Sequence, residues 1–139
     1  MEKTVIEKIL TSFRHIAVVG ISNRAERASH SVARYMMKQG YTIYPVNPNL
    51  KEVLGLHCYA SLSSIPPEVS RKIEIINIFR NAEDVPPIVD EAITMGAKVI
   101  WMQSGISNKE AADKARSAGL LVVENRCIAI EHQSLSQHS

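Results

Sequence analysis

Two kinds of apolar pattern alternate along the chain. The first is a short run of consecutive apolar residues, as in residues 16–19, which is typical of a strand buried on both faces of a parallel sheet. The second places apolar residues three or four positions apart, as Val32, Tyr35 and Met36 do, which indicates an amphipathic helix. The succession of the two patterns predicts an α/β fold in which helices cover a parallel sheet.

The pattern predicts six strands and four long helices. Strands are expected at residues 15–20, 41–46, 73–79, 97–102 and 120–123, with a weak edge strand near residues 57–59. Helices are expected at residues 4–13, 29–39, 84–95 and 107–119, with Ser29, Asp84 and Ser107 as capping residues. Right-handed crossovers then give a Rossmann-type doubly wound sheet of three layers in the order 3-2-1-4-5-6. We expect a single domain over residues 1–139, with a loose polar tail after about residue 131.

Composition excludes several classes of protein. The length of 139 residues suits one domain, and 45% apolar with 22% charged residues is ordinary globular composition. The net charge of +2 and the scattered basic residues argue against nucleic acid or an acidic membrane as a partner. No apolar run approaches the roughly 20 residues that span a bilayer. Two distant cysteines, Cys58 and Cys127, and no apolar secretory signal at the start predict a reducing cytoplasm.

Ligands of open parallel sheets bind beyond the carboxyl ends of the strands. Four loops are expected there, at residues 20–29, 45–49, 79–84 and 103–107. In the first, Gly20 allows a tight turn, Ser22 offers a hydroxyl, and Arg27 can hold phosphate oxygens beside a helix capped by Ser29. Only Gly20 matches the three glycines of a dinucleotide fingerprint, so an ordinary strand-to-helix turn remains an alternative.

The second loop bears on the choice of nucleotide. Domains that bind NAD usually place an acid at the end of the second strand, where it holds the ribose hydroxyls. This chain has Asn47 and Pro48 there, which favours a neutral wall for adenine, although the prolines can equally serve only to end the strand. The third loop offers Phe79 and Arg80, and the fourth offers amide and backbone donors at residues 103–106. Each also has a plain structural interpretation as core, surface charge or turn.

These segments together resemble the small stand-alone CoA-binding domain proteins, and they are similar to the N-terminal domain of the succinyl-CoA synthetase alpha subunit. The segments that carry the resemblance are VVGIS, GYTIYPVNP, EVLGLHCYASL, IFRNAEDVPPIVDEAI, GAKVIWMQSGI and AGLLVVENRCIAIEH. They cover nearly the whole chain in the order of the family. The resemblance implies a Rossmann fold that binds coenzyme A or an acyl-CoA, and it does not by itself imply a catalysed reaction.

The resemblance also implies where the parts of CoA should lie. The phosphates should face the first loop, and the adenosine end should border the second. The nucleotide should lie beside the third loop and the pantetheine arm along the fourth. The residues concerned are Gly20, Ile21, Ser22, Arg27, Ser29, Asn47, Pro48, Phe79, Arg80, Gln103, Ser104, Gly105 and Ile106. The chain departs from the family in lacking a proline near residues 23–25 and in having Asn125 where the family has Asp before Arg-Cys.

Three functions are compatible with this sequence. The first is a CoA-binding module without catalysis of its own, because no nucleophile and base stand in a recognisable order. The related synthetases use separate domains for ATP and for a phosphorylated histidine, which are not expected here. The second is an NAD(P)-dependent or other nucleotide-using enzyme, and the third is a protein-interaction module that has lost its ligand. A metal site is not expected, since His57, Cys58, Cys127 and His132 lack paired ligand spacing.

Overall fold

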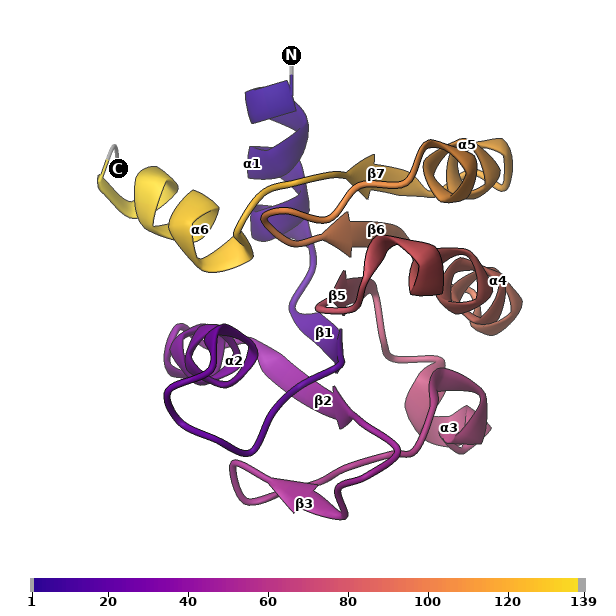
Figure 1. Ribbon diagram of the computed structural model, residues 1–139. Helices are drawn as coiled ribbons and strands as arrows, with labels where there is room; N and C mark the ends of the chain where they lie inside the picture. Colours follow the sequence, from indigo (N-terminus) through magenta and orange to yellow (C-terminus); the bar gives the residue numbers. More distant parts are fainter. Residues whose placement is uncertain (1, 138–139) are drawn as a thin grey trace.

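A five-stranded parallel sheet forms the centre of the molecule (Figure 1). The computed structural model describes residues 2–137. The strands lie in the order β2-β1-β5-β6-β7, so the order reverses between β1 and β5. Their bounds are β1 His15–Val19, β2 Thr42–Val46, β5 Ile75–Ile78, β6 Val99–Met102 and β7 Leu121–Val123. Because all five are parallel, their carboxyl ends share one edge, and the reversal opens a crevice at that edge.

Helices cover both faces of the sheet and make three layers, as Figure 1 shows. One face carries α1 (Glu2–Ser12), α2 (Ala28–Lys38) and α6 (Ile128–Gln137). The other carries α3 (Pro67–Ser70), α4 (Val85–Met95) and α5 (Lys109–Ser117). Alternate residues of β1 enter the two cores, since Ile16 and Val18 pack on the first face while Ala17 and Val19 pack on the second. The predicted Rossmann-type α/β fold, doubly wound with a parallel sheet, is confirmed.

The weak edge strand predicted near residues 57–59 does not form, whereas the other five strands lie in the predicted order, 2-1-4-5-6. The segment after β2 folds back on itself as an antiparallel hairpin of β3 (Glu52–Val53) and β4 (Leu56–His57), separate from the main sheet. Leu54 and Gly55 turn the hairpin with positive φ angles of 56° and 74°. Only Tyr59 runs beside the main sheet, where its N–H donates to the carbonyl of Pro45 at 2.9 Å. One such bridge is too little to extend the sheet.

The C-terminal segment is not the loose tail that its polarity predicts, because α6 continues to Gln137. His132 on this helix has its Nδ1 atom 2.8 Å from the Tyr35 hydroxyl of α2, and its ring meets that of Tyr41 edge to face. Leu135 packs against the same core. Polar side chains that pair with partners far away in sequence therefore hold this helix on the sheet.

Among the described residues, no helix has the length and apolar character to cross a membrane.

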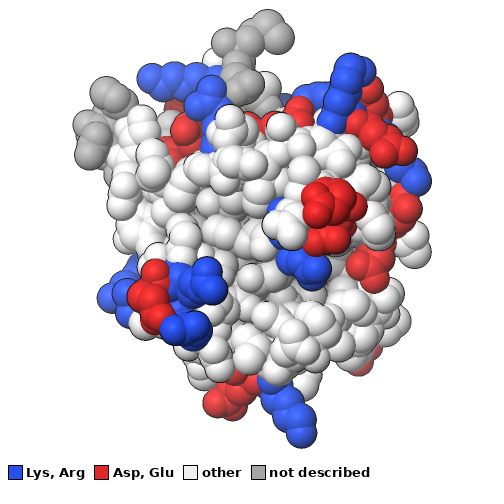
Figure 2. All heavy atoms as spheres, viewed as in Figure 1, with Lys and Arg blue, Asp and Glu red and all other residues white. Residues whose placement is uncertain are grey.

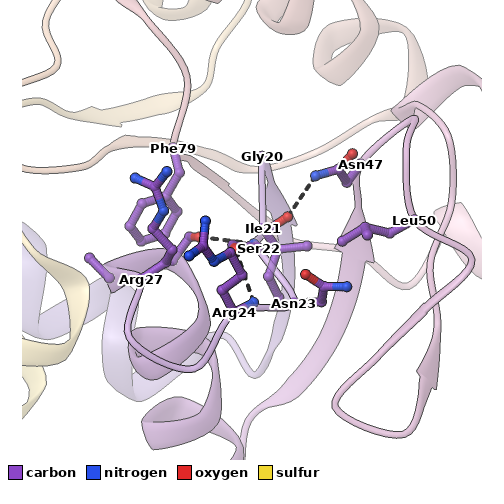
Figure 3. Close-up of a pocket in the computed structure, with 11 residues that line it drawn as sticks. Gly20, Ile21, Ser22, Asn23, Arg24, Arg27, Asn47, Leu50 and Phe79 are labelled. Carbon is purple, nitrogen blue, oxygen red and sulfur yellow. Dashed lines mark hydrogen bonds between the residues drawn. The ribbon is translucent and has the colours of Figure 1, made fainter.

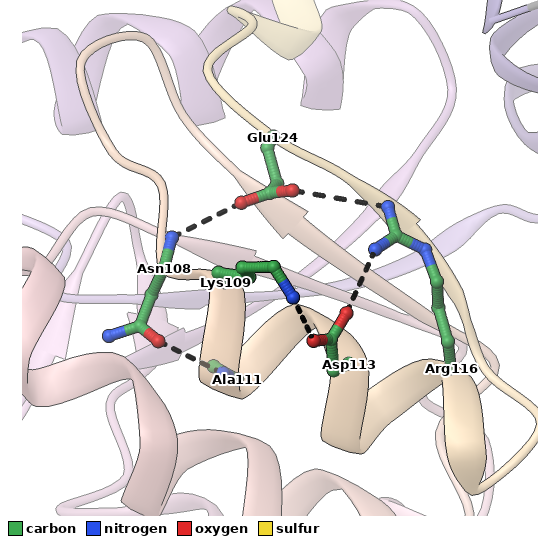
Figure 4. Close-up of polar contacts among 6 residues, drawn as sticks. All are labelled: Asn108, Lys109, Ala111, Asp113, Arg116 and Glu124. Carbon is green, nitrogen blue, oxygen red and sulfur yellow. Dashed lines mark hydrogen bonds and ion pairs between the residues drawn. The ribbon is translucent and has the colours of Figure 1, made fainter.

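Two predicted helix caps also differ from the structure. Asn108, rather than Ser107, caps α5, since its Oδ1 accepts the Ala111 N–H at 2.9 Å (Figure 4). The Asn108 N–H in turn donates to the carboxylate of Glu124 at 3.1 Å, just after β7. Asp84 makes no capping hydrogen bond, because a short 3-10 turn at Ala82–Asp84 precedes α4 and the carboxylate lies 3.2 Å from Arg80. A second such turn lies at Leu62–Ser64.

Candidate functional site

A pocket of about 440 Å³ opens at the carboxyl ends of β1 and β2, beside the start of α2 (Figure 3). It brings together three of the four loops that the sequence predicts at this edge of the sheet. No carboxylate stands among its lining residues. These are Gly20, Ile21, Ser22, Asn23, Arg24, Arg27, Ala28, Ser29, Asn47, Leu50 and Phe79.

Gly20 lets two strand ends approach each other. Its φ angle is +93°, which side chains rarely adopt, and its N–H donates to the Val46 carbonyl at 2.9 Å. A Cβ atom at this position would stand 2.4 Å from the carbonyl oxygen of Phe79 and 2.8 Å from Cδ of Arg80. The sequence predicts a tight turn at Gly20, and the structure adds that the backbone after β5 occupies the place of its missing side chain.

The first turn of α2 holds the peptide groups on both sides of Ser22. The hydroxyl of Ser29 accepts the Ser22 N–H at 2.9 Å, and Nδ1 of the buried His30 donates to the Ser22 carbonyl at 2.9 Å. Ser29 is therefore not the helix cap that the sequence predicts. The helix begins one residue earlier, at Ala28, with Arg27 in the N-cap position. The side chain of Ser29 fastens the loop instead.

The N-terminus of α2 faces the pocket without a side-chain cap. Free N–H groups and the helix dipole make such a terminus favourable for an anion. The exposed Arg27 lies at the same point, and within residues 2–137 its guanidinium has no ion pair or side-chain hydrogen bond. The Ser22 hydroxyl accepts the Arg24 N–H at 3.0 Å, which leaves its own proton to donate. The arrangement suits a phosphate group.

Asn47 ties the end of β2 to the first loop. Its Nδ2 donates to the Ile21 carbonyl at 2.8 Å, and its Oδ1 accepts the Asn49 N–H at 2.8 Å. Ile21 itself is buried, so it meets the pocket mainly through its backbone. Pro48 does not line the pocket, although it directly follows Asn47. Where an NAD-binding domain would present an acid, this chain presents a fixed amide.

A second pocket of about 540 Å³ shares one lining residue, Phe79, with the first. It contains the predicted residues Phe79, Arg80, Gly105 and Ile106, together with Asn81, Ala82 and Glu83. Figure 3 shows Phe79 on the side of the first pocket that lies away from Asn47.

Asn125, the residue that departs from the family pattern, bonds to two residues that line the second pocket. It has a φ angle of 56°, in the left-handed region that asparagine tolerates better than most residues. From there its Oδ1 accepts the N–H of Gly105 at 2.5 Å, and its N–H donates to the Ile106 carbonyl. Asn125 therefore fixes the loop between β6 and α5.

Besides Pro48, two residues predicted for the site line neither pocket. Gln103 is 4% exposed, and its Oε1 accepts both Nδ2 of Asn77 and the N–H of Ile128, each at 2.9 Å. Its side chain thus binds β5 and α6 inside the molecule rather than facing the crevice. Ser104 is exposed and lines neither pocket.

The sequence analysis missed several lining residues. Arg24 could have been found, because it is a second arginine within the loop that was assigned to phosphate. Leu50 carries no signal, since it follows a proline-containing turn without periodicity. Asn81 and Ala82 lie within the loop at residues 79–84 that was predicted at this edge, in the short 3-10 turn before α4, although they were not named as site residues.

The cysteines and histidines do not form a reactive centre in the part of the chain that the structure describes. Burial raises the pKa of the Cys58 thiol, which keeps it protonated and unreactive. Its sulfur lies 3.7 Å from the Asn47 carbonyl, beneath the pocket. Within residues 2–137, no three side chains of His, Cys, Asp or Glu are placed to hold a metal ion.

Comparison with known proteins agrees with this geometry. The CoA binding domain family model matches residues 14–133. An uncharacterized protein of Bacillus subtilis, YneT, is 38% identical over 130 residues, covering 94% of this chain and 93% of that protein. A solved structure of a hypothetical protein from Pyrococcus horikoshii is 42% identical, with a TM-score of 0.91 over 98% of this chain and 93% of that one.

Larger proteins contain a related region. An ADP-forming acetate–CoA ligase of Archaeoglobus fulgidus is 24% identical over 134 residues, which cover 89% of this chain but only 19% of the ligase. The relation that these comparisons show is thus to ADP-forming acetate–CoA ligases, which is coarser than the predicted resemblance to succinyl-CoA synthetase. With a family model that spans most of its length, this chain belongs to the CoA-binding domain family.

Proposed function

We propose that this protein binds coenzyme A or an acyl-CoA in the two pockets at the carboxyl ends of the strands, beside the start of α2. The observation that carries the proposal is the charge of the first pocket. Two arginines and the uncapped N-terminus of α2 face it, and no carboxylate lines it. Such a surface favours a polyanionic ligand such as the phosphates of CoA.

The two pockets together suit a long ligand. A diphosphate at the start of α2 would lie beside Arg27 and the free Ser22 hydroxyl proton. The adenosine end would then lie toward Asn47 and Leu50, and the pantetheine arm would pass Phe79 into the second pocket. The path follows the family assignment, with Gly105 and Ile106 lining the second pocket while the side chain of Gln103 does not.

The proposal favours CoA over NAD. An NAD ribose is normally held by a carboxylate at the end of the second strand. Asn47 occupies that place, and its amide is already bonded at both ends to backbone groups. The site therefore lacks the charged acceptor that normally holds the two ribose hydroxyls of NAD.

We further propose that the domain does not itself catalyse a reaction on the bound ligand. Among the lining residues of the two pockets, Glu83 is the one carboxylate, and neither a histidine nor a cysteine lines either pocket. The related ligases carry out their named reaction in chains of which this domain is a small part. A partner protein or another domain would supply any chemistry.

Calorimetric titration with CoA and with NAD tests the binding proposal. We expect saturable binding of CoA and none of NAD at the same concentrations. Tighter binding of NAD would contradict it. Incubation of the pure protein with acetyl-CoA, and separately with ATP, acetate and CoA, tests the second proposal. Sustained turnover that is lost on mutation of a pocket residue would show that the domain is an enzyme.

A further inference from the structure

Two arginines line the first pocket, and only one of them, Arg27, stands at the uncapped N-terminus of α2. We propose that the other, Arg24, recognises the 3′-phosphate of coenzyme A and makes the site prefer CoA over dephospho-CoA. The inference rests on the proposed function. The two ligands differ only in the phosphate on the 3′ oxygen of the ribose, so a residue that contacts this group affects one ligand and not the other.

The backbone of Arg24 is fixed on both sides. Its N–H donates to the Ser22 hydroxyl at 3.0 Å, and its carbonyl accepts the Arg27 N–H at 3.0 Å. The Ser22 peptide is itself held by Ser29 and His30 of α2. The Arg24 side chain therefore starts from a defined point on the pocket rim, although the side chain is 66% exposed.

The position of Arg24 separates it from the diphosphate site. Arg27 lies at the uncapped end of α2, which provides the backbone donors for one phosphate group. In the view of Figure 3, Arg24 lies between Arg27 and the side of the pocket formed by Asn47 and Leu50. A ribose that links a diphosphate at Arg27 to an adenine near Asn47 would present its 3′-phosphate toward this middle position.

An internal carboxylate competes for the same guanidinium. Oε2 of Glu26 lies 3.1 Å from Nε of Arg24, and the two side chains are 65% and 66% exposed. An ion pair this exposed is weak and can be exchanged for a better anion. The 3′-phosphate dianion of CoA would displace Glu26 from Arg24, so Glu26 lowers the affinity for CoA. Dephospho-CoA has no 3′-phosphate and leaves the ion pair in place, so Glu26 does not affect its affinity.

The charges of Arg24 and Glu26 are not part of a broad basic surface on the face that Figure 2 shows. On the face that it shows, basic and acidic side chains lie next to each other in small groups separated by uncharged surface. A ligand thus meets no extended positive field on this face, and discrimination between phosphates must come from individual side chains.

The test compares the dissociation constants of CoA and dephospho-CoA in four proteins: wild type, Arg24→Gln, Glu26→Gln and the control Arg34→Gln. Arg34 is an exposed arginine of α2 that lines neither pocket. For an exposed charge-assisted hydrogen bond, we expect Arg24→Gln to weaken CoA about three- to tenfold and to leave dephospho-CoA within about twofold. Glu26→Gln should tighten CoA about two- to threefold and leave dephospho-CoA unchanged. Arg34→Gln should alter neither.

Each outcome bears on the inference. A wild-type protein that binds both ligands equally, or an affinity ratio that Arg24→Gln leaves unchanged, overturns the role of Arg24 while the CoA-binding proposal stands. Wild-type protein that binds neither ligand overturns both. Ligand-free melting temperatures of the variants must match the wild type, and a parallel loss of both ligands in Arg24→Gln would show that Arg24 shapes the loop and does not read the 3′-phosphate.

Discussion

The hydroxyl of Ser29 accepts the N–H of Ser22 at 2.9 Å, so the first turn of α2 holds the loop that precedes it. Both Ser29 and the neighbouring His30 are buried, and both bind the same residue of the loop. The loop geometry is therefore part of the folded core rather than a product of ligand binding. A loop prepared in this way costs less free energy to order when an anion arrives.

Replacement of Ser29 by alanine should lower stability and affinity together. The Ser22 N–H would lose its partner in a partly buried place, which costs about 1–3 kcal/mol of unfolding free energy. Affinity for CoA should fall as the loop loosens. Urea unfolding and calorimetry measure the two effects. Ser31→Ala is the control, because the Ser31 hydroxyl bonds only within its own helix, at 3.2 Å from the Ala28 carbonyl. If Ser29 acted merely at the surface, the two variants would behave alike.

The Gln103 side chain should matter for stability rather than for ligand contact. Gln103→Leu keeps a similar volume but removes the oxygen that accepts from Asn77 and Ile128. Each buried donor left without a partner costs about 1–3 kcal/mol. Denaturant unfolding without ligand should show this loss, whereas Ser104→Ala at the neighbouring exposed position should leave stability unchanged. A Gln103→Leu protein of normal stability with weakened CoA binding would restore the role that the sequence suggested.

Strands and loops of this fold could be predicted from sequence because burial leaves a local signal. The apolar runs that became β1, β5 and β6 are buried at nearly every position, and their ends brought the expected loops to one edge. The predicted edge strand near residues 57–59 is wrong because that segment lacks such a run of buried apolar residues. Tyr59 makes one bridge to β2, and the residues just before it form the hairpin that turns at Leu54–Gly55.

Side-chain direction could not be predicted, because partners distant in sequence determine it. Gln103 lies in a loop where a ligand contact is expected, but its side-chain oxygen accepts a hydrogen bond from Asn77, which is 26 positions away in the sequence. In the polar C-terminal segment, His132 contacts Tyr35, which is 97 positions away, and this contact helps to hold the segment as a packed helix. Periodicity reports which faces are buried, and it carries no information about which of two possible hydrogen-bond partners will be nearer.

The packing of His132 predicts that stability falls in acid. Burial, with a smaller contribution from the charge of Arg14, lowers the pKa of this imidazole below its usual 6.5. The unfolded chain then takes up the proton more readily than the folded one, so stability is present above about pH 6.5 and is lost as pH falls through the folded pKa. Unfolding free energies at pH 7.5, 6.5 and 5.5 measure the slope for wild type and His132→Gln. The variant should show a shallower slope, and identical slopes would contradict the assignment.

Gly20 should tolerate no side chain. Gly20→Ala combines an unfavourable φ of +93° with a Cβ placed 2.4 Å from the Phe79 carbonyl. Gly40→Ala is a matched control, because Gly40 has a φ of +97° and open space around its missing Cβ. The backbone term costs about 1–3 kcal/mol in both variants. The close contact should add about 1–3 kcal/mol in Gly20→Ala alone. Urea unfolding measures the difference, and equal losses would show that Phe79 moves aside freely.

Arg27 gives the sharpest prediction for binding. Its guanidinium stands at the N-terminus of α2 without a side-chain partner among residues 2–137, so it is available to make charge-assisted, bidentate bonds to phosphate. Arg27→Ala should cost about 1.5–3 kcal/mol of binding free energy, which is about 10- to 150-fold in the dissociation constant. Arg27→Lys keeps the charge but loses the planar fork, so it should restore the affinity only in part.

Ligand-free melting curves of the Arg27 variants complete this experiment. An exposed arginine without an ion pair contributes little to folding, so the melting temperature without CoA should stay within about one degree of the wild type. Added CoA should then raise the melting temperature of wild type more than that of Arg27→Lys, and that of Arg27→Lys more than that of Arg27→Ala. Unchanged CoA affinity in Arg27→Ala would remove Arg27 from the site and leave the anion to the backbone donors of α2 and the Ser22 hydroxyl alone.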